Sequence, residues 1–499
     1  MQVPKICLTL TESTIEKNLA LVEKYRDCID LVELRADFLD ENESLHIRKF
    51  PSLAKIPCIL TIRRLADGGK YVAGESLRAM LFARALAFAD DQHQENNFQY
   101  VDFESDFFVS SLQDAVMAFG TKTIRSYHNM NGPVSDIVKR CDEMRRTVYE
   151  IPKIAFMPKT LDDVKNLFYE TRNFSEYEHI LCAMGPMGVA SRILAYKTHS
   201  FLTYTSAEDG ENSLKNIGHI DPFTLDHVYH LKKLNERTEI FGVTGWPLEK
   251  TDSPKLHNAG YKMHSMNAVY IPIPSNDIHQ TIKFANEIGM RGLSVTVPHK
   301  ETVVSDLFEV DEHVKEIGAC NTIVQKNGEW NGFNTDFSGF AKALLEFTRL
   351  KNLRRKKVAI IGAGGASRAI ACAVKILGGK ACVFNRTLSR AEQVADTFGF
   401  DSASLTADSI GKLRKYSDLI IQTTSVGMNS TEMSNVQNDP IYFYKFSGKE
   451  ILFDLVYTPE VTPIMQRAMM AGCRVCNGSE MLKYQAYEQF KIFTGVEYD

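Results

Sequence analysis

The chain has 499 residues, more than one compact domain usually holds, so two or three domains are expected. Hydrophobic residues make up 44% and charged residues 24%, which is ordinary globular usage and excludes a disordered or low-complexity chain. The formal charge of -4 gives no global attraction to nucleic acid or to an anionic membrane. Any substrate must therefore be found in local sites.

Targeting and redox signals point to a reducing compartment. The chain contains no run of about eighteen apolar residues, and its opening MQVPKICLTLTEST lacks the basic and apolar segments of a signal peptide. We therefore expect a cytoplasmic protein without a membrane span. The ten cysteines follow no disulfide framework, and we interpret Cys473 and Cys476 as small side chains of a buried strand. No metal is predicted.

The first half alternates short β-rich runs with helical patterns. The β-rich runs are 5–10, 31–37, 58–63, 100–105, 122–128, 151–156, 180–185 and 201–204. Helical spacing separates most of them, as at 14–26, 76–89 and 161–171. Eight βα units in about 230 residues fit a closed (β/α)₈ TIM barrel, whose typical length is about 250 residues. An open doubly wound sheet is the alternative.

Charged side chains recur on one face of these strands. Glu33, Arg35 and Asp37 alternate with apolar residues and therefore share a face. Polar or charged side chains also stand in the other β-rich runs, at Thr61, Arg63, Asp102, Glu104, Arg125, His128 and Lys153. This pattern predicts either an ion-pair network inside the barrel or an active site at the carboxyl ends of the strands.

Lys153 lies in the middle of an otherwise apolar strand, IPKIAFM. Burial favours the neutral amine of a lysine, and a neutral amine can attack a carbonyl and form a Schiff base. The alternative is a lysine that reaches solvent or pairs with Glu33 or Glu104. His128 ends its own strand and is a natural proton-transfer partner, although a lone His is more often a core or surface residue.

These residues carry a resemblance to type I 3-dehydroquinate dehydratase over about residues 5–230. The matching motifs are Glu33-x-Arg35-x-Asp37, Thr61-Ile62-Arg63 with Gly68-Gly69, Asp102-x-Glu104, Ser126-Tyr127-His128, Ile151-Pro152-Lys153-Ile154-Ala155 and Ser191-Arg192. The resemblance implies a Schiff base at Lys153 and proton transfer by His128. It also implies substrate binding by Glu33, Arg35, Arg63 and Arg192.

The late loop departs from that family. The family usually reads Ser-Ala-Pro-Gly-Gln there, whereas this chain has SAEDGE at 206–211 or, on another alignment, the segment from Ser213 to Gly218-His219. We expect lid closure or substrate affinity to differ from the family's, while the covalent chemistry is kept.

A second part begins near residue 238. Residues 221–237 read as a last barrel helix, and 239–245 restarts as a fresh strand. The linker has no Gly/Ser-rich or Pro-rich tract, so the two parts are expected to be closely apposed. We predict domains 1–238 and 239–499, the latter with a substrate-binding part over 239–345 plus the C-terminal segment and a nucleotide-binding part over 346–470.

Residues 357–385 have the pattern of a Rossmann-type βαβ unit. The strand 357–361 runs into the turn Gly362-Ala363-Gly364-Gly365-Ala366, followed by a helix over 368–377 and a strand over 380–385. The glycines let the backbone approach a pyrophosphate, although Ser367 replaces the third glycine of the usual fingerprint. The second strand ends in Asn385-Arg386-Thr387 without a carboxylate, so NADP is predicted in preference to NAD.

Hydroxyl and amide side chains cluster upstream of this unit. The clusters are Thr251-Asp252-Ser253-Pro254, the segment 294–300, Asn321-Thr322 and Asn334-Thr335-Asp336. Such groups suit a small polyhydroxy acid, and the alternative is that they are turn and capping residues.

This set resembles shikimate dehydrogenase over residues 239–499, with further matches at 424–428, at Asp454-x-x-Tyr457 and at 478–485. The resemblance implies that Lys300 and Asp336 form the catalytic pair. It implies shikimate contacts by Thr251, Ser253, Thr296, Asn321, Tyr457 and Gln485, and cofactor contacts by 362–366, 385–387 and Gly478. Ser294 stands where the family commonly has Asn, and Thr251 where it has Ser; the shorter Ser294 is expected to relax discrimination among related acids.

Together the two resemblances predict a fused enzyme of the shikimate pathway. It would dehydrate 3-dehydroquinate to 3-dehydroshikimate and reduce that product to shikimate with NADPH. One alternative is a metabolite sensor without turnover, which would have lost Lys153, His128, Lys300 or Asp336; all four are present. Another is a quinate dehydrogenase with NAD preference in the second half.

Overall fold

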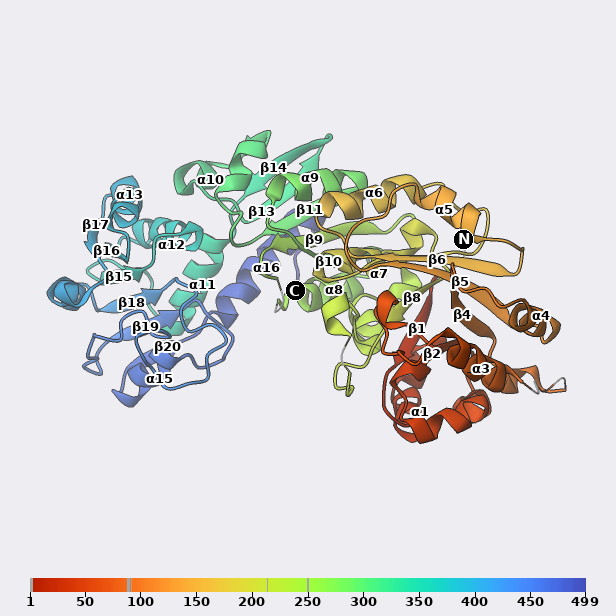
Figure 1. Ribbon diagram of the computed structural model, residues 1–499. Helices are drawn as coiled ribbons and strands as arrows, with labels where there is room; N and C mark the ends of the chain where they lie inside the picture. Colours follow the sequence, from red (N-terminus) through yellow and green to blue (C-terminus); the bar gives the residue numbers. More distant parts are fainter. Residues whose placement is uncertain (1–2, 88–89, 91, 213, 249–250) are drawn as a thin grey trace. The chain divides into compact units, whose positions relative to one another are not determined.

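The computed structural model describes residues 3–87, 90, 92–212, 214–248 and 251–499 (Figure 1). The chain forms two compact units. The first comprises Met1–Val243 and Pro247–Met290, and the second comprises Thr244–Trp246 and Arg291–Asp499. Among the described residues, none of the helices has both the length and the apolar character needed to cross a membrane.

Eight parallel strands form the barrel of the first unit. They are β1 (Lys5–Leu10), β2 (Leu31–Arg35), β3 (Cys58–Thr61), β4 (Tyr100–Glu104), β5 (Lys122–Asn129), β6 (Glu150–Phe156), β7 (Ile180–Ala183) and β8 (Leu202–Thr205). Their order is β7-β6-β5-β4-β3-β2-β1-β8, and just before β7 and β8 the N–H of Phe201 donates to the carbonyl of His179 (2.7 Å). This sequential order confirms the barrel and excludes the doubly wound sheet.

Helices follow most of the barrel strands (Figure 1). They are α1 (Ile15–Tyr25), α2 (Phe50–Ala54), α3 (Glu75–Leu86), α4 (Ser110–Ala118), α5 (Ile137–Met144), α6 (Leu161–Thr171) and α7 (Val189–Ile193). The single helix predicted over 221–237 is wrong. A π-helical turn at Thr224–Val228 and a 3₁₀ turn at Leu231–Lys233 stand there, separated by His230 in the left-handed region (φ 49°), which a continuous right-handed helix does not accommodate.

The barrel interior has an apolar floor with a charged layer beside it. The floor includes Leu31, Tyr100 and Ile151, each near the start of its strand. Because side chains alternate along a strand, the residues two positions further on face the same interior. These are Glu33, Asp102 and Lys153, and all three are buried. The alternation that predicted a shared polar face thus places these charges one layer above the floor.

The first unit also contains β9 (Glu239–Gly245) as far as Val243, with β10 (Ala268–Pro274), α8 (Ser253–Met263) and α9 (Ile278–Glu287). Helix α9 packs against α6. The rings of Phe168 and Phe284 lie 5.8 Å apart, and the Gln280 side chain accepts a hydrogen bond from the N–H of Leu161 (3.1 Å). Barrel and following segment therefore share one core.

The second unit begins with the neighbouring strands β11 (Met290–Val295), β13 (Thr322–Lys326), β14 (Glu329–Phe333) and β12 (Glu309–Val310). A parallel sheet follows, built from β15 (Lys357–Ile361), β16 (Lys380–Asn385), β17 (Asp401–Ser404), β18 (Leu419–Gln422), β19 (Ile451–Asp454) and β20 (Arg474–Cys476). Its order β17-β16-β15-β18-β19-β20 is that of a Rossmann fold. The predicted nucleotide-binding fold is confirmed.

Helices cover both faces of this sheet, and a buried cluster lies on each face. They are α10 (Glu312–Ile317), α11 (Asp336–Thr348), α12 (Gly365–Ile376), α13 (Leu388–Phe398), α14 (Ile410–Lys415), α15 (Pro463–Met470) and α16 (Ser479–Thr494). Helix α12 begins at the predicted glycine turn, three residues before the predicted helix.

Candidate active sites

A cavity of about 120 Å³ opens at the carboxyl ends of the barrel strands. Its lining contains every residue predicted for the dehydratase site, namely Glu33, Arg35, Arg63, His128, Lys153 and Arg192. Glu33 and Arg35 lie on β2, Arg63 just after β3, His128 on β5, Lys153 on β6 and Arg192 on α7, so the fold brings distant parts of the sequence together. Carboxyl ends of barrel strands are where enzymes of this fold build their sites.

Lys153 is buried and surrounded by acids. Its Nζ donates to Asp102 (3.0 Å), lies 3.7 Å from Glu33 and sits 4.2 Å from the centre of the Tyr204 ring. Pairing with Glu33 was one expected alternative, but Asp102 takes the place expected for Glu104. The lysine is therefore paired with carboxylates and also lines the cavity. A role as the Schiff-base nucleophile and a role in an ion pair are thus compatible.

His128 faces the same cavity with an unused ring nitrogen. Its Nδ1 is buried and has no hydrogen-bond partner among the described residues. Burial, with the charges of Arg63 and Lys153, holds the pKa of His128 well below its usual value. A neutral imidazole beside a lysine can take up a proton, which is what a general base requires.

Two arginines of the cavity are matched by carboxylates. Arg63 pairs with Asp102 (2.7 Å) and Glu104 (2.9 Å), and although burial opposes its charge these acids raise its pKa. Arg35 forms a bidentate ion pair with Asp37, with hydrogen bonds of 2.9 and 2.7 Å. Both guanidinium groups are thus held in fixed orientations.

Arg192 is different because it has backbone partners instead of acids. Its guanidinium donates to the carbonyls of Ile217 (2.8 Å) and Tyr204 (3.4 Å), and Nε has no partner within the described chain. Burial lowers its pKa. A buried cation without a carboxylate, at the wall of a cavity, is suited to bind the carboxylate of a ligand.

The sequence prediction missed His219 as a cavity residue. Its Nδ1 is buried without a partner in the described structure, and burial together with Arg192 holds its pKa well below the usual value. Gly218 before it has φ 81°, and a Cβ there would lie 2.5 Å from the Gly185 carbonyl oxygen. The second of the two loop alignments ends on this pair, and Ser213, with which it starts, lies outside the described residues.

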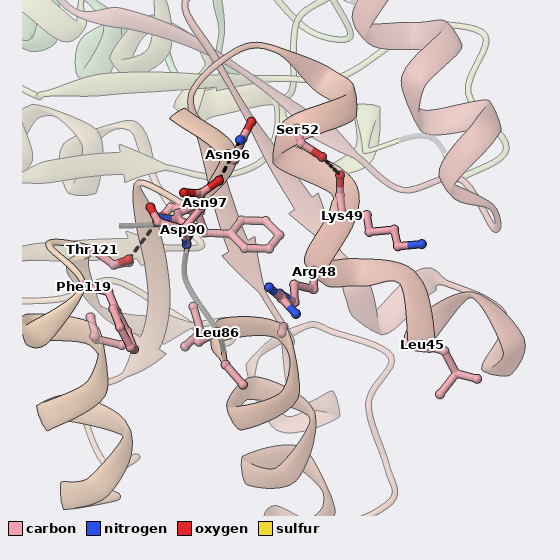
Figure 2. Close-up of a pocket in the computed structure, with 14 residues that line it drawn as sticks. Leu45, Arg48, Lys49, Ser52, Leu86, Asp90, Asn96, Asn97, Phe119 and Thr121 are labelled. Atoms are coloured by element: carbon pink, nitrogen blue, oxygen red, sulfur yellow. Dashed lines mark hydrogen bonds between the residues drawn. The ribbon is translucent and has the colours of Figure 1, made fainter. Parts of the chain in front are cut away.

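A larger cavity of about 420 Å³, whose lining is shown in Figure 2, lies beside the amino ends of β4 and β5. Phe98 and Thr121, which line it, stand just before β4 and β5. The Asp90 carboxylate beside it already accepts from the backbone of Gln92 and His93 (3.0 Å each). That end of a (β/α)₈ barrel serves stability, so we place the dehydratase site in the smaller cavity.

In the second unit, the predicted catalytic pair is in contact. Lys300 Nζ lies 2.5 Å from Asp336 Oδ2, and Asp336 is the first residue of α11, where the helix dipole favours a negative charge. Asn321 donates to Asp336 (2.9 Å) and lies 3.4 Å from the Gln485 side-chain oxygen. Four predicted residues therefore converge at one point.

The other predicted shikimate contacts have separate positions. Thr296 follows β11 and Tyr457 follows β19, and both are half-buried. Thr251 and Ser253 belong to the first unit, at the start of α8. Ser294 donates to Gln489 (2.9 Å), so its hydroxyl is already engaged within the fold.

The glycine turn before α12 fits a dinucleotide. Gly362 has φ 117°, and a Cβ there would lie 2.5 Å from Thr423 Oγ1. Nothing lies within 4 Å of a Cβ on Gly364, so the backbone at the helix start is open. Ser367, in place of the third glycine, accepts from the Gly364 N–H (3.2 Å).

The end of β16 fits a phosphate. Arg386 is exposed, and no carboxylate of the described residues forms an ion pair with it. Asn385 Nδ2 donates to the Thr387 carbonyl (3.0 Å), which fixes the turn. A free guanidinium at this strand end matches a 2′-phosphate. Gly478, the remaining predicted cofactor contact, caps α16, and a Cβ there would lie 2.1 Å from the Leu455 carbonyl oxygen.

Comparison with known proteins finds a family for each part of the chain. Residues 6–236 match the family Type I 3-dehydroquinase, 243–323 the shikimate dehydrogenase substrate binding domain, and 344–469 the family shikimate / quinate 5-dehydrogenase. A chloroplastic bifunctional 3-dehydroquinate dehydratase/shikimate dehydrogenase of Arabidopsis thaliana is 31% identical over 511 residues, which cover 98% of this chain and 82% of that protein.

Relatives of the second part alone are also similar. A shikimate dehydrogenase (NADP(+)) of Desulforamulus reducens is 35% identical over 273 residues, covering 53% of this chain and 92% of that protein. The crystal structure of shikimate dehydrogenase from Aquifex aeolicus is 32% identical with a TM-score of 0.48, covering 53% of this chain and 95% of that chain. The chain therefore belongs to the family of bifunctional enzymes that join a type I 3-dehydroquinate dehydratase, a lyase, to an NADP-dependent shikimate dehydrogenase, an oxidoreductase.

Proposed function

We propose that this chain dehydrates 3-dehydroquinate in the barrel cavity and reduces the resulting 3-dehydroshikimate to shikimate beside Lys300. The observation that carries the proposal is that Lys153, His128 and Arg192 line one cavity, and that Arg192 has no carboxylate partner among the described residues. A sensor without turnover would not need a nucleophile and a base at the same wall. The contact between Lys300 and Asp336 supports the second activity.

The dehydration uses groups of the barrel. The neutral amine of Lys153 attacks the ketone carbon, and loss of water leaves an iminium ion. His128 removes a proton from the neighbouring carbon, and the electron pair forms an enamine. The enamine expels the β-hydroxyl group, which leaves as water with the proton returned by His128. Hydrolysis of the iminium releases the product ketone and restores the amine.

The remaining cavity residues bind the substrate. Arg192 takes the carboxylate because its guanidinium has no acid partner in the described structure. Glu33, Arg35 and Arg63 hold the hydroxyl groups. Hydrogen bonds from Thr9 and Thr61 to Glu33, and the ion pairs of Arg35 with Asp37 and of Arg63 with Asp102, keep them in place before the substrate arrives.

The reduction uses groups of the second unit. Lys300 donates a proton to the carbonyl oxygen, while Asp336 orients the ammonium group and Asn321 orients Asp336. The residues 362–366, 385–387 and Gly478 hold NADPH, which supplies the hydride when bound. Thr251, Ser253, Thr296, Tyr457 and Gln485 bind the hydroxyl and carboxylate groups of the acid.

Mass spectrometry of the protein after borohydride treatment with 3-dehydroquinate tests the first activity. We expect one reduced adduct on Lys153 in the wild type and none in Lys153→Ala, which keeps shikimate oxidation. Lys300→Ala is the matched control, since it should keep the adduct and lose most dehydrogenase turnover. An adduct that persists in Lys153→Ala would contradict the assignment.

Rates with alternative substrates test the second activity. Arg386 favours the phosphate-bearing cofactor, so we expect higher kcat/KM with NADP than with NAD, and Arg386→Ala to narrow that difference. Shikimate is expected to be oxidised faster than quinate. A preference for quinate with NAD would make the second part a quinate dehydrogenase.

We also propose a cytoplasmic location and a domain boundary near residue 238. All ten cysteines are free thiols and nine are buried, which suits a reducing compartment. Strand β9 starts at Glu239, which supports a division into 1–238 and 239–499, the latter into 239–345 with the C-terminal segment and 346–470, although 239–243 and 247–290 pack with the barrel in the first unit. Cell fractionation tests the first point and limited proteolysis the second.

A further inference from the structure

Six buried charged residues form a continuous ladder that ends beside Lys153. Arg78 donates to Glu104 (2.7 Å), Glu104 accepts from Arg63 (2.9 Å), and Arg63 pairs with Asp102 (2.7 Å). Asp102 accepts from Lys153 (3.0 Å), which lies 3.7 Å from Glu33. Each of the six is at most 5% exposed. We call this set the charge ladder.

Arg78 is the ladder member that the dehydratase site does not explain. It lies on α3 and is fully buried, although it does not line the cavity. Its guanidinium donates to the Ile62 carbonyl (2.9 Å), lies 4.5 Å from the centre of the Phe107 ring, and pairs with Glu75 at the solvent edge. A buried arginine is costly, so a specific use for its charge is expected.

Charge balance suggests that use. The ladder has three positive members, Arg78, Arg63 and Lys153, against three negative members, Glu104, Asp102 and Glu33. It is therefore neutral only while Lys153 is an ammonium. The nucleophilic amine leaves one excess negative charge, and in a poorly screened interior each further negative charge would favour the ammonium.

Other groups around Lys153 contribute less to this balance. Burial keeps Cys7 on β1 and Tyr204 on β8 protonated by raising their pKa, and it keeps His128 and His219 neutral by lowering theirs. Arg35 on β2 forms an ion pair with Asp37, and Arg192 is the proposed binding partner of the substrate carboxylate. Within the ladder, only Lys153 changes its charge. The other five members keep theirs whether the lysine is a neutral amine or an ammonium.

We propose that Arg78 is a positioning residue for the dehydratase. Acting through Glu104 and Arg63, it supplies the positive charge that lets Lys153 release its proton, and it holds Arg63 at the cavity wall. This inference rests on the Schiff-base function proposed above and extends the machinery to a residue outside the cavity.

The test is the pH dependence of borohydride trapping with 3-dehydroquinate. Arg78→Met removes the charge but keeps the length of the side chain. We expect the pH of half-maximal trapping to rise by about half a unit to one unit, with a parallel shift in the kcat/KM profile. Arg78→Lys restores a charge, and the midpoint should return toward the wild-type value.

Arg125→Met is the matched control. Arg125 is also fully buried, pairs with Glu150 (2.6 Å) and donates to the carbonyls of Phe107 (2.9 Å) and Glu104 (3.4 Å), but among the described residues it forms no ion pair with a ladder member. The Arg125→Met variant should lose stability, as Arg78→Met should, but its pH of half-maximal trapping should stay at the wild-type value. Equal shifts in both variants would overturn the proposal, because the effect would then be merely structural.

Glu104→Gln gives the opposite sign. It removes a negative charge, so the midpoint should fall, and in combination with Arg78→Met it should return close to wild type. In the double variant the carboxylate that loses its Arg78 partner is also removed, so one buried charge fewer is left unpaired than in Arg78→Met. The double variant therefore tests the role of Arg78 even if the single variant does not fold. A folded Arg78→Met with an unchanged midpoint would refute the role of Arg78. Absence of trapping in the wild type would instead refute the Schiff-base function.

Discussion

Gly365 packs against Lys300, since a Cβ placed on Gly365 would lie 3.1 Å from the Cβ of the lysine. Gly365 is the first residue of α12, and Lys300 pairs with Asp336 at 2.5 Å. The backbone of the nucleotide turn therefore lies against the residue proposed to donate the proton. Binding of the cofactor and placement of the proton are linked by this contact.

Gly365→Ala is expected to damage the dehydrogenase alone. The added methyl group forces Lys300 to move by a few tenths of an ångström, and we expect kcat/KM for shikimate to fall about tenfold because the reacting groups are misplaced. Steady-state rates of both reactions measure this, and dehydration should be unchanged.

Gly411→Ala is the control for that substitution. Gly411 lies on α14 of the same sheet domain, and nothing is within 4 Å of its Cβ position. It should keep both activities and gain up to about 1 kcal/mol of stability, since alanine favours a helix. If Gly365→Ala behaved like Gly411→Ala, the contact with Lys300 would have no consequence.

Arg192→Met should separate binding from stability. Arg192 has no acid partner in the described part of the chain, so its loss leaves no buried carboxylate unpaired. We expect the KM for 3-dehydroquinate to rise about 10- to 100-fold, the value of one or two charge-assisted hydrogen bonds, with an unchanged or higher Tm.

Arg63→Met gives the contrasting result. Its loss takes one of two cationic partners from each of the buried carboxylates Asp102 and Glu104 and leaves one buried negative charge uncompensated, which should cost about 3–5 kcal/mol of stability. Thermal unfolding of the two variants side by side checks both expectations. A Tm of Arg192→Met as low as that of Arg63→Met would show that Arg192 is a structural group.

Phe284→Ala should weaken the barrel from outside it. Phe284 is fully buried on α9, and its ring meets Phe168 of α6 at 5.8 Å within the first unit. Deleting the ring should cost about 3–5 kcal/mol and speed the thermal loss of dehydratase activity, although residue 284 lies beyond the dehydratase match at 6–236.

Phe308→Ala serves as the control for Phe284→Ala. Phe308 is 73% exposed, so its removal should change stability by less than about 0.5 kcal/mol. Dehydratase activity of the heated variants is the readout. A barrel that is as heat-resistant in Phe284→Ala as in the wild type would mean that α6 and α9 unfold independently.

Alternation along the strands was enough to predict most of the dehydratase site. Glu33, Asp102 and Lys153 share a face because each stands two positions after an apolar floor residue, and barrel closure then brings the strands together. The glycine turn at 362–366 was predictable for a similar reason, because strand, turn and helix follow one another in the sequence.

Partners that depend on tertiary packing were not predictable. Arg78 reads as a polar residue on an amphipathic helix, and nothing local shows that it turns inward to Glu104. His219 becomes a cavity residue only because Gly218 fits against Gly185. The helix predicted over 221–237 failed at His230, whose left-handed backbone has no strong sequence signal.

Asp454 is expected to make the second unit less stable as the pH rises. It is fully buried at the end of β19, and burial, reinforced by the charge of Asp439, raises its pKa to about 7, despite hydrogen bonds from Thr462 and Val456. An unfolded aspartate titrates near pH 4. Between about pH 4 and 7 the folded state therefore holds a proton that the unfolded state has lost, and stability falls across that window by up to roughly 4 kcal/mol.

Asp454→Asn removes this dependence while keeping an acceptor oxygen. Its advantage over the wild type in the free energy of unfolding should grow from pH 4 to 7 and then level off, as urea denaturation at several pH values would show. Asp401→Asn should differ in both sign and pH window, because the hydrogen bond from Tyr416 lowers the pKa of Asp401. This variant should be less stable than the wild type by an amount that is constant above about pH 4 and shrinks as the pH falls below it. An advantage of Asp454→Asn that is the same at pH 5 and pH 8 would mean that the Asp454 carboxylate is ionised throughout, with its burial offset by contacts other than a bound proton.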